Sequence, residues 1–215
     1  MAFDYWAFHY IEYLFENGYT AGTQTEPTRL FSPERILNRA EMAVFLVRSL
    51  HPEVQGYVPD APSAVIWQDP PLEYAAAFKS SAPSLRPAQG WEDKWTMELY
   101  DEGLTAGCSA YPPLYCPARA NTREEMAVFA VRIARGSGYE PPAAAQAIFG
   151  DVPLWEAGGG VNWAARWVEQ AYRDGLVQAC QTDMEQMLYR PDDPVTRAEA
   201  ACMLYYALRG GSNLP

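Results

Sequence analysis

Residues Thr196–Leu208 read TRAEAACMLYYAL, a polar start followed by an almost wholly apolar run. Thr196 and Glu199 have the spacing of a capping box, in which the threonine accepts from the amide three residues on and the glutamate bonds back to the cap. The pattern therefore predicts that a helix begins here. Because Ala200–Leu208 is apolar on nearly all sides, a single flanking helix cannot cover it, and we expect burial among several helices.

The same pattern occurs twice more upstream. Aligning Arg39, Arg123 and Arg197 brings three capping boxes into register, and two further apolar helices are expected over Met42–Leu50 and Met126–Ala134. Four more landmarks keep nearly the same spacing from each arginine. They are an aromatic residue (Phe31, Tyr115, Tyr189), a proline (Pro33, Pro117, Pro191), a glycine (Gly18, Gly103, Gly175) and a tryptophan (Trp6, Trp91, Trp163). The chain therefore contains a threefold internal repeat.

Each stretch from the tryptophan to the glycine predicts an amphipathic helix. In the third copy Trp163 and Trp167 fall on one helical face. Val168 and Ala171 extend the same face, and Gly175 then supplies the left-handed residue that follows a helix end. We expect three pairs of helices, with the capped helices packed together and the others outside them. The fold is predicted as mainly α, with three helix-loop-helix repeats in a pseudo-threefold arrangement around a central three-helix bundle.

Long connections rich in proline, glycine and serine separate the copies. We expect repeat 1 over residues 1–50, a connecting insertion over 51–90, repeat 2 over 91–136, a linker with repeat 3 over 137–210, and a tail over 211–215. Because the first connection is long for a loop, an additional helical turn is expected at Leu72–Lys79.

Composition and charge argue against several classes of function. The 215 residues carry 27 acidic and 16 basic side chains, a net charge of −11, which argues against nucleic-acid binding. No apolar run is long enough for a membrane span, and the N-terminal stretch lacks the basic region of a signal peptide. Catalytic triads and phosphate-binding glycine loops are missing, so we expect neither an enzyme nor a cofactor. His9 and His51 are expected to be surface or packing residues, and no metal site is expected.

Four cysteines bear on the compartment. Cys108 and Cys116 lie eight residues apart around a proline-rich loop, which favours a disulfide, with two reduced thiols as the alternative. Such a disulfide implies an oxidising environment. Cys180 and Cys202 form either a second pair or two buried thiols.

The repeated pattern resembles the S-layer homology domain, whose repeats run from Phe-x-Asp-Val-Pro through Trp-Ala and a glycine-ended helix to Thr-Arg-Ala-Glu. The fullest match is the third copy, with Phe149, Asp151, Val152, Pro153, Trp163, Ala164, Gly175, Leu176, Tyr189, Arg190, Pro191 and residues 196–199. The first copy contributes GYTAG at 18–22 and NRAE at 38–41. The second contributes GLTAG at 103–107 and TREE at 122–125.

The resemblance implies a triplet that anchors a larger protein at the cell surface. The implied location is extracellular, at the cell envelope, and the implied partner is an envelope polysaccharide or peptidoglycan-linked glycan. Carried over residue by residue, Arg39, Arg123 and Arg197 would bind an anionic group, such as the carboxylate of a pyruvylated sugar, in grooves between the repeats. Guanidinium geometry suits a carboxylate, and the amides of the adjacent helix N-terminus would assist.

The same residues also have structural interpretations. Each arginine could instead pair with a nearby carboxylate. Trp6, Trp91 and Trp163 would either stack on a sugar ring or, in the interpretation that the pattern favours, pack in the core. Glu124 stands where the family has alanine and is expected to weaken anion capture beside Arg123. An alternative function is a structural protein that packs against itself or another protein in a surface layer, sheath or filament.

Overall fold

The computed structural model describes residues 4–69, 90–177, 180 and 188–210, and over these ranges the fold is mainly helical, as predicted. The helices are α1 (Phe8–Glu16), α2 (Arg39–Leu50), α3 (Asp93–Asp101), α4 (Arg123–Arg135), α5 (Ala165–Arg173) and α6 (Arg197–Leu208). A short hairpin pairs β1 (Ser109–Ala110) with β2 (Pro113–Leu114) in antiparallel register. The turn expected at Leu72–Lys79 and the tail over 211–215 lie outside the described residues. None of the described helices has the length and apolar character needed to cross a membrane.

Capping boxes start α2, α4 and α6. Asn38, Thr122 and Thr196 each accept a hydrogen bond from the amide three residues on, and the glutamate at that third position returns a bond to the cap backbone. Each box satisfies amides that the first helical turn would otherwise leave unpaired. These three helix starts agree with the sequence prediction.

Glycines end α1, α3 and α5 in the same way. Gly18, Gly103 and Gly175 have φ values of 77°, 73° and 72°, a left-handed conformation that glycine adopts without a Cβ clash. After α1, the Tyr19 amide bonds the Leu14 carbonyl at 2.8 Å, the 6→1 bond of a Schellman motif. The glycines therefore turn the chain sharply out of each outer helix.

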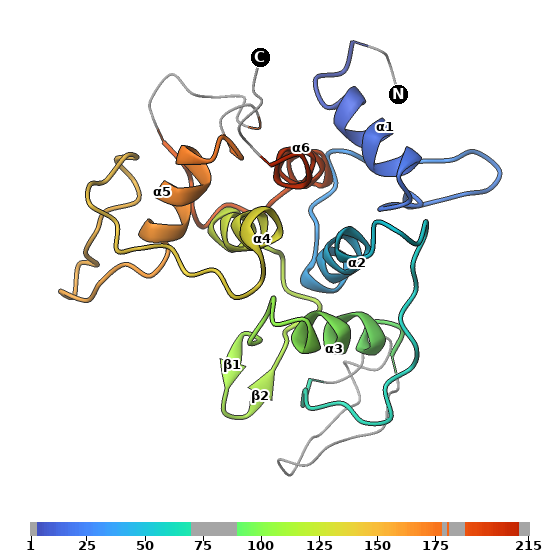
Figure 1. Ribbon diagram of the computed structural model, residues 1–215, viewed down its shortest axis with the longest axis horizontal. Helices are drawn as coiled ribbons and strands as arrows, with labels where there is room; N and C mark the ends of the chain where they lie inside the picture. The colour runs from blue at the N-terminus through green and yellow to red at the C-terminus, as the bar shows by residue number, and fades with distance from the viewer. Residues whose placement is uncertain (1–3, 70–89, 178–179, 181–187, 211–215) are drawn as a thin grey trace.

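The three capped helices lie at the centre of the molecule, and the other three lie outside them (Figure 1). The outer helix of each repeat packs mainly on the inner helix of another repeat: α1 on α6, α3 on α2, and α5 on α4. The expected pairing of the two helices within one repeat is therefore wrong. Its physical reason is the long connection between them, such as 17–38, which crosses to the neighbouring repeat before its inner helix begins.

Three backbone hydrogen bonds join the loops that lead into the inner helices. The Leu37 amide donates to the Val195 carbonyl at 2.9 Å, and the Val195 amide donates to the Asn121 carbonyl at 2.9 Å. The Asn121 amide donates to the Leu37 carbonyl at 3.0 Å, which closes a ring. All three residues are fully buried and stand two positions before the repeat arginine. We call these bonds the hydrogen-bond ring.

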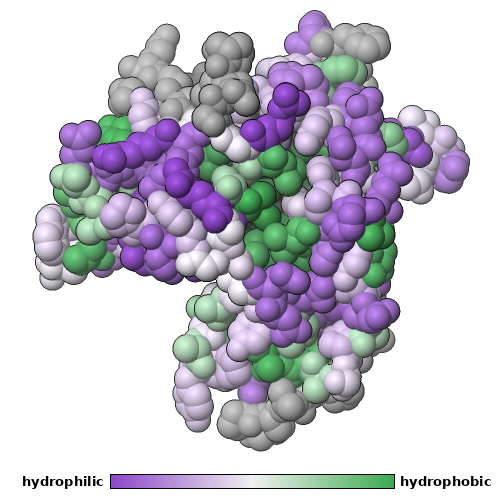
Figure 2. Space-filling view, in the orientation of Figure 1, coloured by the Kyte–Doolittle hydropathy of each residue, from purple (hydrophilic) through white to green (hydrophobic). Residues whose placement is uncertain are grey.

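One hydrophobic core fills the space between the inner helices and extends under the outer ones. Leu46 of α2, Met126 of α4 and Leu204 of α6 are all fully buried in it. Figure 2 shows hydrophobic side chains gathered over the middle of one face, around the three central helices, with hydrophilic side chains around them. Mutual burial thus accounts for inner helices that are apolar on nearly every side.

Candidate functional site

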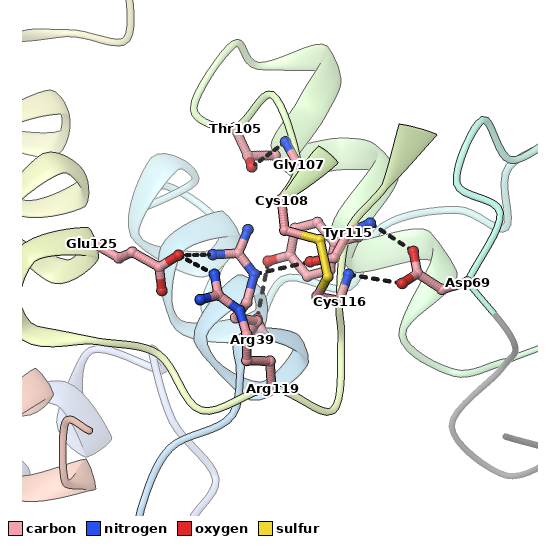
Figure 3. Close-up of a disulfide and its surroundings, with 9 residues drawn as sticks. All are labelled: Arg39, Asp69, Thr105, Gly107, Cys108, Tyr115, Cys116, Arg119 and Glu125. Carbon is pink, nitrogen blue, oxygen red and sulfur yellow. Dashed lines mark hydrogen bonds and ion pairs between the residues drawn. A yellow bond between two sulfur atoms is a disulfide. The ribbon is translucent and has the colours of Figure 1, made fainter. Parts of the chain in front are cut away.

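Arg39 joins the first repeat to the second. Its Nε donates to the Tyr115 carbonyl at 2.9 Å, and Nη1 donates to the Glu125 carboxylate at 2.7 Å (Figure 3). The Tyr115 hydroxyl returns a bond of 3.0 Å to the Arg39 carbonyl, and the guanidinium lies 4.9 Å from the centre of the tyrosine ring. Arg119 contacts the same carboxylate. Arg39 is only 3% exposed, so its charge is neutralised inside the protein.

Arg123 joins the second repeat to the third with the same set of contacts. Its Nε donates to the Tyr189 carbonyl at 2.8 Å, and Nη1 donates to Glu199 at 2.6 Å. The Tyr189 hydroxyl donates to the Arg123 carbonyl at 2.9 Å. Glu125 and Glu199 therefore act both as capping residues and as the partners of a buried arginine from the preceding repeat.

Arg197 joins the third repeat back to the first, with fewer contacts. Its Nε donates to the Phe31 carbonyl at 2.8 Å, but phenylalanine has no hydroxyl to return a bond. The equivalent carboxylate, Glu41, is bound instead by Arg35 at 2.6 Å. Among the described residues Arg197 forms no ion pair, although it is only 4% exposed and lies over the rings of Phe31 and Phe45.

A cavity of about 560 Å³ lies at this junction. Its volume is within the range of small-ligand sites. The lining residues are Tyr19, Thr20, Ala21, Gly22, Thr23, Ser32, Arg35, Glu41, Val44, Phe45, Arg48 and Arg197. Four of them come from one face of α2, at the helical spacing i, i+3, i+4 and i+7. We call this space the junction cavity.

The junction cavity carries net positive charge inside an acidic protein, because three arginines and one glutamate line it. Burial lowers the pKa of Arg197 to about 10, while nearby Glu41 acts in the opposite direction. Arg197 therefore remains a cation at neutral pH, poorly solvated and without a carboxylate bound to it. An anion that entered the cavity would meet a guanidinium to which no carboxylate of the described residues is bound.

The helix N-terminus beside Arg197 does not offer the free amides that we expected. The Arg197 amide donates to the Arg35 carbonyl at 3.0 Å, and the Ala198 amide donates to the Pro33 carbonyl at 2.9 Å. The same pattern occupies the first amides of α2 and α4. The loop of the neighbouring repeat satisfies these two donors, so they are not available to a ligand.

The repeat tryptophans lie away from the junction cavity, since none of them lines it. Trp6 is partly buried against the core, but Trp91 and Trp163 are 41% and 47% exposed, so core packing is wrong for these two. The reason is helix register. Helix α5 begins at Ala165, so Trp163 precedes the helix, and Trp167 occupies the buried face at 4% exposure.

Two disulfides brace the loops. Cys108 and Cys116, paired as the sequence favoured, close the base of the β1–β2 hairpin with Cα atoms 6.1 Å apart. Asp69 accepts from the amides of Tyr115 and Cys116 at 2.6 and 2.9 Å, which holds this loop against the insertion (Figure 3). The second disulfide joins Cys180 to Cys202 of α6, which decides between the alternatives left open above.

Sequence reasoning missed Arg35 and Arg48 as cavity residues. Aligning the three repeats on their capping glutamates would have revealed part of this difference. Arg35 and Arg119 precede their capping glutamates by six residues, whereas repeat 3 has Asp193 at that position. Phe31 also replaces the tyrosine of the other two copies. What the sequence does not encode locally is that Arg197 faces Phe31 and Glu41, since these lie at opposite ends of the chain.

Comparison with known families identifies part of the third repeat. Residues 160–201 match the S-layer homology domain, and this segment includes α5 and the start of α6. The chain therefore contains an S-layer homology domain, a non-catalytic type of module that anchors proteins to the cell wall and indicates a cell-surface protein. A search among curated proteins returned no match.

Proposed function

We propose that this chain is a wall-anchoring triplet that binds an anionic envelope glycan, such as one bearing a pyruvylated sugar, in the junction cavity. Arg197 is the proposed carboxylate-binding residue, and Arg35 and Arg48 add positive charge around it. The observation that carries the proposal is the buried Arg197 guanidinium, which has no ion-pair partner among the described residues. A glycan carboxylate would take the place that Glu125 and Glu199 take at the other two junctions.

Arg39 and Arg123 stay predictions as glycan-binding residues. Each already contacts a carboxylate of the next repeat, so a glycan would have to displace that contact before binding. Exposed Trp91 and Trp163 are available to stack on sugar rings outside the cavity. We therefore propose Arg197 as the main site and these two tryptophans as accessory contacts.

The proposal is tested by co-sedimentation of the chain with purified cell-wall sacculi. Replacing Arg197→Gln should weaken binding roughly tenfold or more, because a hydrogen bond to a charged group contributes about 1.5–3 kcal/mol. Sacculi treated with mild acid, which removes pyruvate ketals, should bind the unmodified chain as weakly as untreated sacculi bind the variant.

The matched control is Arg166→Gln on α5, which removes a partly exposed arginine that pairs with Glu140 outside the junction cavity. It should leave sacculus binding unchanged, and the melting temperatures of both variants should be measured alongside. Equal binding by Arg197→Gln and the unmodified chain would contradict the proposed site.

A second candidate function is packing against itself or another surface protein. The observation in its favour is the exposure of apolar side chains around one turn, where Trp155 and Val161 pair across an isolated bridge and are 62% and 67% exposed. Under this hypothesis the chain would ignore sacculi and assemble in solution. Ultracentrifugation of the unmodified chain in the co-sedimentation buffer distinguishes the two functions.

A further inference from the structure

The packing of α3 on α2 brings a histidine to two glutamates that are distant in sequence. His51 is the C-cap residue of α2, whereas Glu98 and Glu102 occupy the last turn and C-cap of α3. One ligand atom from each of the three lies within 4.8 Å of the others. Sequence reasoning expected no metal site because the chain has only two histidines, and it could not foresee this juxtaposition.

The imidazole of His51 is held in a fixed orientation. Its ring stacks on Tyr57 with centroids 3.8 Å apart, and its Nδ1 lies 3.4 Å from Glu53 Oε1 in a hydrogen bond. With Nδ1–H as donor to Glu53, Nε2 carries the lone pair. A metal-binding histidine commonly bonds a carboxylate through its other nitrogen in this way.

The free nitrogen faces a carboxylate without a hydrogen bond. His51 Nε2 is buried and has no hydrogen-bond partner in the described part of the chain, yet it lies 3.4 Å from Glu98 Oε1. That oxygen already accepts the Tyr57 hydroxyl at 2.9 Å, so its position is set. In the Nδ1–H tautomer two acceptors face each other, and a cation between them would relieve the repulsion of their lone pairs.

The distances and the local charge suit a small cation. Two ligands on a tetrahedral zinc ion, with bonds of about 2.0–2.2 Å, lie about 3.4 Å apart, the separation of Nε2 and Oε1 here. The C-terminal ends of α2 and α3 meet at this point, and helix C-termini carry partial negative charge. Glu102 is exposed, and its carboxylate already lies within 4.8 Å of the other two ligand atoms.

We propose that His51, Glu98 and Glu102 bind a divalent transition metal ion, with Zn²⁺ as the best fit. One nitrogen and two carboxylate oxygens favour Zn²⁺ over the hard cations Ca²⁺ and Mg²⁺, which prefer all-oxygen sites. Three protein ligands leave one position for water. The ion would clamp the outer helix of repeat 2 to the inner helix of repeat 1, which is a stabilising role separate from glycan binding.

The test is calorimetric titration of the full chain with ZnCl₂ in a buffer that does not bind metals. We expect about one Zn²⁺ per chain. His51→Gln and Glu102→Gln should each weaken binding roughly tenfold or more, since even loss of a ligand's hydrogen-bond partner has that effect. Because Glu102 is exposed, Glu102→Gln should not disturb the fold. It therefore tests the site even if His51→Gln lowers stability.

The matched control is His9→Gln, which removes the other histidine of the chain from an exposed position on α1. It should bind Zn²⁺ as the unmodified chain does, and Co²⁺ should give the strong visible absorption of a tetrahedral site in both. Absence of Zn²⁺ binding, or binding that survives His51→Gln or is lost in His9→Gln, would overturn the proposal.

Discussion

Asn121 is the polar member of the hydrogen-bond ring. Leu37 and Val195 occupy the equivalent positions, and the Asn121 side chain is fully buried with them. Its Nδ2 donates to the Thr122 carbonyl at 3.2 Å, but Oδ1 has no partner among the described residues. A buried acceptor without a hydrogen bond carries a desolvation penalty that an apolar side chain of similar shape avoids.

We therefore expect Asn121→Leu to raise stability by about 1 kcal/mol, which corresponds to a melting temperature higher by about 2–4 °C. Differential scanning calorimetry measures the change. The reciprocal variant, Leu37→Asn, should lower the melting temperature by burying a new polar group at the matching position. If Asn121→Leu melts below the unmodified chain, Oδ1 has a partner that stabilises the fold.

Glu124 is the acidic residue at a position that is alanine in the other two repeats. Burial raises its pKa from 4.5 to about 7, and nearby Asp192 and Glu125 act in the same direction. A carboxyl whose pKa rises on folding binds its proton more tightly in the folded state. Its favourable contribution is full below pH 4.5 and is lost as the pH rises to about 7.

Glu124→Gln should therefore match the unmodified chain below about pH 4.5 and exceed its stability above about pH 7. The expected gain is about 1 kcal/mol, because the side chain is only half-buried and solvent screens the effect. Urea denaturation of both proteins from pH 4 to 8 gives the difference curve. Glu26→Gln, in an exposed loop, serves as the control and should give a flat difference. A flat curve for Glu124→Gln would contradict the raised pKa.

For the helices, the sequence predicted where the capped helices begin, but it did not predict how the helices pack on one another. Thr196 starts a helix because its side chain bonds a nearby backbone amide, and Gly175 ends one because it adopts a left-handed conformation. Both effects depend on residues close in sequence, so the sequence alone predicts them. The outer helices begin too late for Trp163 to share the face of Trp167, a shift of two residues that periodicity does not resolve.

The candidate site was predictable only in part, for the same reason. The repeat register singled out Arg39, Arg123 and Arg197 as equivalent residues. Their environments differ because each contacts another repeat, and only the contacts of Arg197 are incomplete among the described junctions. That difference depends on Phe31 and Arg35. The sequence around Arg197 gives no sign that these two residues are its neighbours.

At the scale of the whole molecule, the three arginines connect the repeats in a cycle. Arg39 and Arg123 each bind a carbonyl and a carboxylate of the next repeat, whereas Arg197 binds only a carbonyl. Together with the hydrogen-bond ring, these contacts link the three repeats to one another. They also give the junctions unequal strengths.

We expect the loss of stability on replacing each arginine to depend on the number of contacts that it makes. Arg39→Gln and Arg123→Gln each break the ion pair of a buried arginine and should cost about 2–3 kcal/mol, below the value for fully buried pairs because Glu125 and Glu199 retain some exposure and Glu125 keeps its contact with Arg119. Arg197→Gln should cost about 1 kcal/mol, since it breaks no ion pair among the described residues. Thermal unfolding of the three variants in one buffer measures the order.

The same three variants separate structure from ligand binding, because the proposed glycan site predicts the opposite order. Arg197→Gln should be the mildest change in melting temperature and the most severe in sacculus binding, whereas Arg39→Gln and Arg123→Gln should lower stability while folded protein still binds. If all three lose stability equally, Arg197 has acquired a carboxylate partner within the protein. The junction cavity would then lack the unpaired guanidinium on which glycan binding depends.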